Sequence, residues 1–291
     1  MSGSLFTVWT VGANTFREAV RQRFFVFLII LALGLVGSAF LFMRFDFGNE
    51  TLKFVADFGF GAILLFGTIL SVVMASQLLF SEIDNRTALT MLAKPVRRWE
   101  FMVGKWVGLM LLLGVFCLAM FLILAVMLYL QEASLRALAQ EQIGMGRLLP
   151  SESPFADGGG LVSYGGLALF AVLQWLRLCL LAAITLFIGS FAGTSLYTVV
   201  VSFFVTLICQ LQYIATGATD ETTHPLIAAF VFAFTRVFPN LQLFNVGDPL
   251  VFPSRATEPL GWAPLEIAGV ALLYTLASLG LAVYAFRKRE I

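Results

Sequence analysis

Long apolar runs separated by short polar segments dominate the pattern of this sequence. A helix needs about 20 mostly apolar residues to cross a hydrocarbon core about 30 Å thick. Several runs meet that length, and the segments between them carry nearly all of the charge. We therefore predict an all-α integral membrane protein in which residues 1–291 form a single transmembrane domain. The six predicted spans are 24–42, 58–80, 106–130, 165–191, 195–213 and 267–286.

One further apolar stretch, 225–238, leaves the number of crossings open. It is short for a span and contains Arg236, which favours a re-entrant or interfacial element. A seventh crossing remains the alternative, and it would place the two ends of the chain on opposite sides of the membrane.

The distribution of basic residues predicts the orientation, because cytoplasmic loops carry an excess of Lys and Arg. With the N-terminus inside, the inner segments hold eleven Lys and Arg residues and the outer segments hold six. We therefore predict that both termini are cytoplasmic. The long external loops are then 131–163, which begins with a predicted short helix at 132–142, and 214–264.

Composition agrees with this class, since 60% of the residues are hydrophobic and 12% are charged. The three cysteines each stand alone inside an apolar run, which predicts neither a disulfide framework nor a metal site. His224, the only histidine, precedes a proline in a predicted outer loop. Gly104-Lys105 lacks the glycine run of a P-loop. We therefore expect no catalytic site, no cofactor in this chain and no nucleic-acid partner.

Arg177 is the one charged residue inside a predicted span. A cation at mid-depth costs at least about 2.5–3.5 kcal/mol on insertion scales, so it usually faces protein or water. Arg177 could line a substrate path or hold an anionic group. It could also snorkel toward the outer interface beside Gln174 and Trp175.

Two cytoplasmic segments carry the most information. Residues 7–23 show apolar and polar positions at helical spacing, which predicts an interfacial helix resting on membrane lipid before the first span. The connection 81–105 reads SEIDNRTALTMLAKPVRRWEFMVGK. Its acidic start, Lys94 and Pro95 predict a short amphipathic helix. Such a helix either packs on its own spans or docks in a groove of another protein.

The connection 81–105 also resembles that of the permease subunits of ABC-2 type ABC transporters. The resemblance rests on Glu82, the stretch 87–92, Lys94-Pro95-Val96-Arg97-Arg98 and Gly104-Lys105 before the third span. Asn14-Thr15-Phe16-Arg17-Glu18-Ala19 is similar to the interfacial helix of that family. Residues 238–245, FPNLQLFN, and 286–290, FRKRE, resemble the branch named for multicopper-enzyme maturation.

The resemblance implies a six-span permease of the type V exporter class in the plasma (inner) membrane of a prokaryote. It implies a second permease subunit, identical or different, and two copies of an ABC ATPase subunit that bind ATP and Mg²⁺. In this family the inner connection contains the helix that docks on the ATPase. The implied coupling residues are Glu82, Arg86, Thr87, Leu89, Leu92, Pro95 and Arg98.

The substrate does not follow from the resemblance, and copper is not assigned to it because the chain shows no metal site. Two rival functions remain open. A secondary transporter or channel would show broken helices, inverted repeats or several intramembrane ionisable groups, of which this chain offers only Arg177. A non-transporting membrane scaffold is the other alternative.

Overall fold

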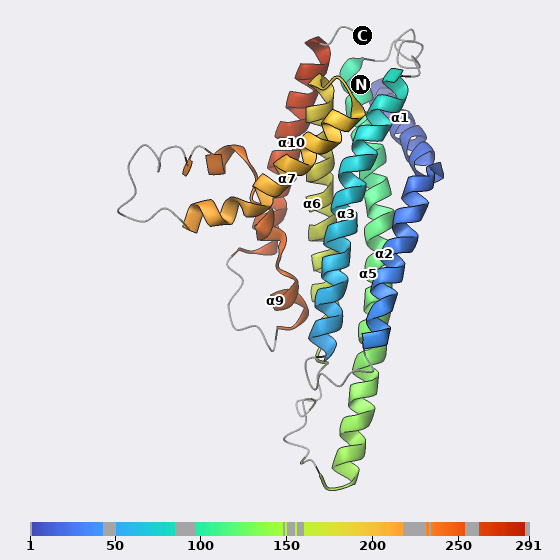
Figure 1. Cartoon of the computed structure of the whole chain (residues 1–291), viewed down its shortest axis with the longest axis vertical. Helices are drawn as coiled ribbons and strands as arrows, with labels where there is room; N and C mark the ends of the chain where they lie inside the picture. Colours follow the sequence, from blue (N-terminus) through green and yellow to red (C-terminus); the bar gives the residue numbers. More distant parts are fainter. Residues whose placement is uncertain are drawn as a thin grey trace.

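The structure, a computed structural model, is an elongated helical bundle (Figure 1). It describes residues 2–42, 51–84, 97–147, 149, 155, 160–217, 231–232, 234–253 and 262–288. These residues form helices, turns and irregular segments, and none of them lies in a strand. The elements are α1 (Ser2–Arg21), α2 (Arg23–Phe42), α3 (Thr51–Asp84), α5 (Arg98–Gly144), α6 (Tyr164–Phe191), α7 (Ser195–Gly217), η3 (Leu241–Phe244), α9 (Gly247–Val251) and α10 (Pro264–Lys288).

The helices have the length and composition of membrane spans, which confirms the prediction of an all-α, multi-pass membrane protein. In the described part of the chain, five helices are long and apolar enough to cross a bilayer. The pair α1 and α2, which meet at a 64° bend, adds a sixth when counted as one span. The described part of the chain therefore holds five or six candidate spans, against the six that the sequence predicts.

The helix α1 corresponds to the segment predicted to lie at the membrane interface. Its outer face exposes Leu5, Phe6 and Trp9, as expected of a helix that rests in the headgroup layer. Its inner face buries small residues, Thr15 and Ala19 among them. The bend at Gln22, between Arg21 and Arg23, then turns the chain into α2.

The helix α5 is longer than any membrane requires. Its 47 residues span about 70 Å at 1.5 Å per residue. The sequence predicts a span at 106–130 and a separate short helix at 132–142, whereas the structure joins them into one helix that begins at Arg98. No glycine or proline separates the two segments, so nothing interrupts the backbone hydrogen bonds. In Figure 1 the end of α5 extends beyond the other helices, away from the chain termini.

The helix α6 forms the centre of the bundle and packs against α3, α5, α7 and α10. Three side chains bond to backbone carbonyls across its interfaces. Ser71 donates to the Leu178 carbonyl at 2.8 Å, Trp106 to the Cys179 carbonyl at 3.1 Å, and Trp175 to the Met110 carbonyl at 3.0 Å. Hydrogen bonds of this kind join helices in a bilayer, where apolar contact alone gives little preference for protein over lipid.

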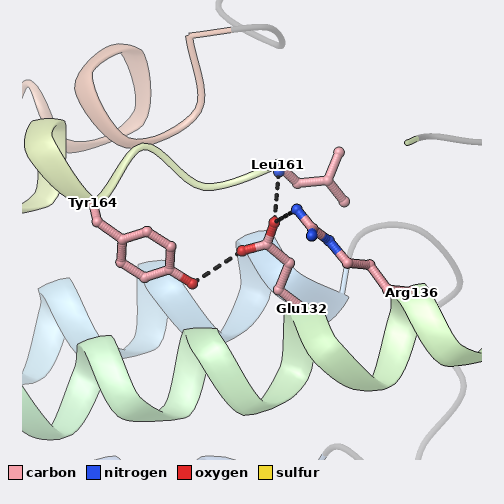
Figure 2. A network of polar contacts seen from close by, with 4 residues as sticks. All are labelled: Glu132, Arg136, Leu161 and Tyr164. Atoms are coloured by element: carbon pink, nitrogen blue, oxygen red, sulfur yellow. Dashed lines mark hydrogen bonds and ion pairs between the residues drawn. The ribbon is translucent and has the colours of Figure 1, made fainter. Parts of the chain in front are cut away.

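At the end opposite the termini, Glu132 joins the extension of α5 to the segment that leads into α6 (Figure 2). Its carboxylate is nearly buried, with 5% of the residue exposed. It accepts hydrogen bonds from the Leu161 amide at 2.8 Å, the Tyr164 hydroxyl at 2.9 Å and Arg136 at 3.2 Å. One acidic side chain therefore fixes the start of α6 against α5.

We expect Glu132→Ala to lower the stability of the purified protein by about 1–3 kcal/mol, because it removes the charged acceptor shared by the Leu161 amide, the Tyr164 hydroxyl and Arg136. Thermal unfolding in a neutral detergent measures this. Glu141→Ala is the matched control, since Glu141 is exposed on the same helix and its loss should change the midpoint little. Equal shifts for the two variants would contradict the role given to Glu132.

After α7 the chain returns along the side of α6 in short, irregular elements. Part of the stretch 225–238, for which a re-entrant element and a seventh crossing were the two predictions, lies outside the described residues. Its described end, 234–237, is helical. The chain then passes through η3 and α9, which contact α6.

Candidate functional site

The first candidate site lies at the end of the bundle where the chain termini meet (Figure 1). We name it the terminal cluster and define it as Ser4, Glu18, Ser81, Arg98, Glu100 and Lys105. These residues come from α1, α3 and α5, and Arg98 also reaches α10. The segment 85–96, which joins α3 to α5, is flanked on both sides by this cluster.

Glu100 and Arg98 connect the first turn of α5 to its neighbours. Glu100 accepts a hydrogen bond from the Arg97 amide at 3.1 Å, in the manner of an acidic residue that caps the start of a helix. Its other oxygen accepts one from Ser4 of α1. Arg98 donates to the carbonyls of Phe286 and Arg287 at 3.3 and 2.8 Å. A cation there satisfies the free carbonyls at the end of α10 and interacts favourably with its dipole.

Lys105 joins α5 to α3 inside the protein. It is fully buried, and its ammonium donates to the Leu78 carbonyl at 2.7 Å. The same ammonium lies 5.7 Å from the centre of the Phe101 ring, and that ring stacks on Phe286 of α10. Ser81, one turn further along α3, donates to Glu18 at the end of α1. The ends of four helices are thus held together, and the connection 85–96 joins two of them in the sequence.

The structure gives only part of the predicted coupling segment. Arg98 lies in the terminal cluster, and the backbone of Glu82 belongs to the last turn of α3. The predicted coupling residues Arg86, Thr87, Leu89, Leu92 and Pro95 lie outside the described residues, so their role remains a prediction.

We expect Arg98→Ala to loosen the last turn of α10, because the carbonyls of Phe286 and Arg287 lose a charged donor. Hydrogen–deuterium exchange of the purified protein should be about tenfold faster in that turn, as expected for the loss of about 1.5 kcal/mol of hydrogen bonding. Arg97→Ala is the control, since the neighbouring Arg97 side chain is exposed. Unchanged exchange in Arg98→Ala would show that the contact does not hold α10.

The second candidate site surrounds Arg177 at the midpoint of α6. The residue is 2% exposed, and its guanidinium points into the protein instead of following the helix to its end. It donates to Gln210 of α7 at 2.9 Å and to Gln174 at 3.4 Å. Gln210 in turn donates to Gln242 of η3 at 2.9 Å, and Gln174 to the Phe244 carbonyl at 2.8 Å. Three elements therefore meet at one buried cation.

The partners of Arg177 are neutral. Among the described residues, no carboxylate forms an ion pair with it, and its Nε atom is buried without a hydrogen-bond partner. A buried guanidinium is normally stabilised by a carboxylate or phosphate that accepts two of its hydrogen bonds. Amide oxygens supply weaker compensation, and the set around Arg177 leaves one nitrogen atom, Nε, without an acceptor.

The helix α7 faces this cluster with its polar side. Its buried residues are Thr198, Ser202, Thr206, Cys209 and Gln212, none of which is aliphatic. Its outward face carries large exposed apolar residues: Leu196, Val200, Phe204, Leu207 and Leu211. In Figure 1 the helix leaves the bundle at a steep angle. The helix therefore turns its polar residues away from lipid, as expected of a membrane span.

The sequence prediction placed Gln174 beside Arg177 but missed Gln210 and Gln242. A signal for Gln210 was present, because Thr198, Ser202, Thr206 and Gln210 recur every fourth residue along an otherwise apolar span. Polar residues at that spacing share one face of a helix, and in a membrane such a face turns away from lipid. Glu100 and Glu132 gave no comparable signal, since both lie in polar segments where carboxylates are ordinary.

Comparison with known proteins agrees with this architecture. A search among curated proteins finds none with significant similarity to the chain. The sequence profile described as "ABC-2 family transporter protein" matches residues 9–291, nearly the whole chain. It includes most of α1 and the entire terminal cluster apart from Ser4. The chain therefore belongs to the ABC-2 family of ABC transporter membrane subunits.

Proposed function

We propose that this protein is the permease subunit of an ATP-driven transporter that works as a dimer with two copies of a separate ABC ATPase. The observation that carries the proposal is the packing of the helix ends that flank the connection 85–96 in the sequence. The ends of α1, α3, α5 and α10 are held together by Lys105, Arg98, Glu100 and Ser81. A force applied there reaches four helices at once.

The mechanism follows from this arrangement. The connection 81–105 docks on the ATPase through Glu82, Arg86, Thr87, Leu89, Leu92, Pro95 and Arg98, and closure of the ATPase on ATP and Mg²⁺ moves it. The terminal cluster transmits that movement to the spans, which alternate between inward and outward states. The ATPase must contact the two states with different free energies, because otherwise ATP could not shift their populations. Both termini are cytoplasmic, in the plasma (inner) membrane of a prokaryote.

The finer resemblance to the multicopper-enzyme-maturation branch rests on residues 238–245 and 286–290. We propose that the protein is evolutionarily related to that branch, and we assign no substrate on this ground. Copper is not proposed as the substrate, since no group of three or more His, Cys, Asp or Glu side chains could hold a metal in the described part of the chain.

Co-purification tests the coupling. The tagged permease is expressed together with a candidate P-loop ATPase, and Leu89→Asp/Leu92→Asp should abolish recovery of the ATPase. Leu138→Asp is the matched control, because Leu138 is an exposed leucine on the distant extension of α5. If the double variant retains the ATPase and its rate of ATP hydrolysis, the coupling assignment is wrong.

A further inference from the structure

The cluster around Arg177 has the features of a binding site whose ligand is an anion. We propose that Arg177, with Gln174, Gln210 and the polar face of α7, binds the oxyanion of an amphipathic substrate, such as a phosphate or carboxylate joined to an apolar body. This inference deepens the proposed transport function by naming the substrate class.

The first argument is the charge balance of the site. Arg177 is buried at the middle of a membrane helix with neutral partners, and a cation there is costly unless an anion or water compensates it. A phosphate or carboxylate oxygen in place of the Gln210 amide oxygen would form a shorter and stronger bond. A second oxygen could accept from Nε, which has no partner.

The second argument concerns two further polar atoms of α7, the helix that carries Gln210. The Ser202 hydroxyl and the Gln212 amide oxygen are buried on α7 and have no hydrogen-bond partner. Native interiors leave few such atoms unsatisfied. On α7 they accompany a buried face with no aliphatic side chain. A tightly packed helix interface would not need this composition, whereas a face that a polar group contacts in another state would.

The third argument concerns access and favours an amphipathic ligand. A cavity of about 280 Å³ adjoins Gln174 from the side of α3 and α9, but Asp57 and Asp248 line it. Lys53 pairs with Asp248 at 3.1 Å, so the three side chains leave one excess negative charge, which disfavours entry of a free anion by this route. On the other side, α7 presents an apolar face to lipid, with Leu196, Phe204 and Leu211 exposed. A ligand that enters beside α7 can keep its apolar body in lipid while its oxyanion reaches Arg177.

The proposal is tested by binding to the purified permease alone, in dodecyl maltoside. A ligand that binds the folded protein raises its unfolding temperature by mass action. The probes, at equal concentrations, are dodecyl phosphate, dodecyltrimethylammonium and inorganic phosphate. We expect dodecyl phosphate alone to stabilise the protein. A larger effect of the cationic probe would overturn the anion site, and an equal effect of inorganic phosphate would overturn the amphipathic class.

Variants separate binding from folding. Arg177→Gln should weaken the apparent affinity for dodecyl phosphate at least about tenfold, as expected for loss of a charged hydrogen-bond partner, and Arg177→Lys should retain part of it. Arg236→Gln is the control, because it removes an exposed cation near the end of α7. Equal affinity in Arg177→Gln and the wild type would overturn the proposal.

Gln210→Glu gives the sharpest result. A carboxylate at that position would lie about as close to Arg177 as the amide oxygen does now, at 2.9 Å, and would act as a permanent internal anion. We expect this variant to unfold at a higher temperature than the wild type and to lose its response to dodecyl phosphate. A retained response would overturn the proposal. Because no ATPase is present, the ATPase coupling and the anion site can each fail independently of the other.

Discussion

Gly166→Ala should destabilise the protein more than alanine at any other glycine that the structure describes. A Cβ atom at Gly166 would lie 1.8 Å from the Leu250 carbonyl oxygen and 2.6 Å from its carbonyl carbon. Both are backbone atoms, so no side-chain rotation can relieve the overlap. We expect a loss of stability of about 3 kcal/mol, at the upper end of the costs of overpacking, because α9 must separate from α6.

The neighbouring residue provides the control for this prediction. A Cβ atom at Gly165 would have no atom within 4 Å outside its own local helix, so Gly165→Ala should leave the unfolding temperature unchanged or raise it slightly. The two variants add the same methyl group one residue apart. If both lower the unfolding temperature equally, the packing of α9 on α6 is not the cause.

The contact between Gly166 of α6 and Leu250 of α9 also affects the candidate binding site around Arg177. Ser163, at the start of α6, donates its amide to the Val251 carbonyl at 2.8 Å, and η3 and α9 form the short return beside Gln174. Displacement of α9 in Gly166→Ala should therefore also weaken dodecyl phosphate binding in any protein that remains folded, because η3 supplies Gln242. Binding at wild-type strength would show that η3 and α9 move independently.

Gly108→Ala should have the second largest effect, at the junction of α1 and α5. A Cβ atom there would approach the Thr15 Cβ at 2.6 Å and the Gly12 carbonyl oxygen at 2.7 Å. Gly104, one turn earlier, faces Val11 at a similar distance. Two glycines four residues apart allow helix backbones to approach closely in a membrane. We expect Gly108→Ala to push α1 away from α5 and to cost about 2 kcal/mol.

This displacement has a specific readout. Limited proteolysis should cleave α1 faster in Gly108→Ala, since Thr15 and Ala19 lose their cover. Gly280→Ala is the control, because it adds the same methyl group to α10 with no atom within 4 Å. Because the Ser4 hydroxyl bonds to Glu100, a displaced α1 should also impair ATPase recovery in the co-purification assay. Unchanged proteolysis would show that α1 is held by other contacts.

The sequence by itself determined the class of the protein and the approximate position of its helices. Membrane spans are readable because the bilayer imposes a length of about 20 apolar residues and excludes unpaired backbone groups. The turn between α6 and α7 was readable for the same reason, since Gly193 and Thr194 interrupt two long apolar runs. The resemblance carried by residues 81–105 gave the family.

Only the tertiary structure decided how polar residues are paired. Whether Arg177 snorkels or points inward depends on the neighbouring helices, and no local pattern near Arg177 identifies Gln210 as its partner or Gln242 as the partner of Gln210. The same holds for Arg98, whose acceptors lie at the far end of the sequence on α10, and for Gly166, whose neighbour is the backbone of Leu250. Burial in lipid is a property of one segment and can be read from it. Hydrogen bonds between segments depend on packing, which joins residues that are distant in the sequence.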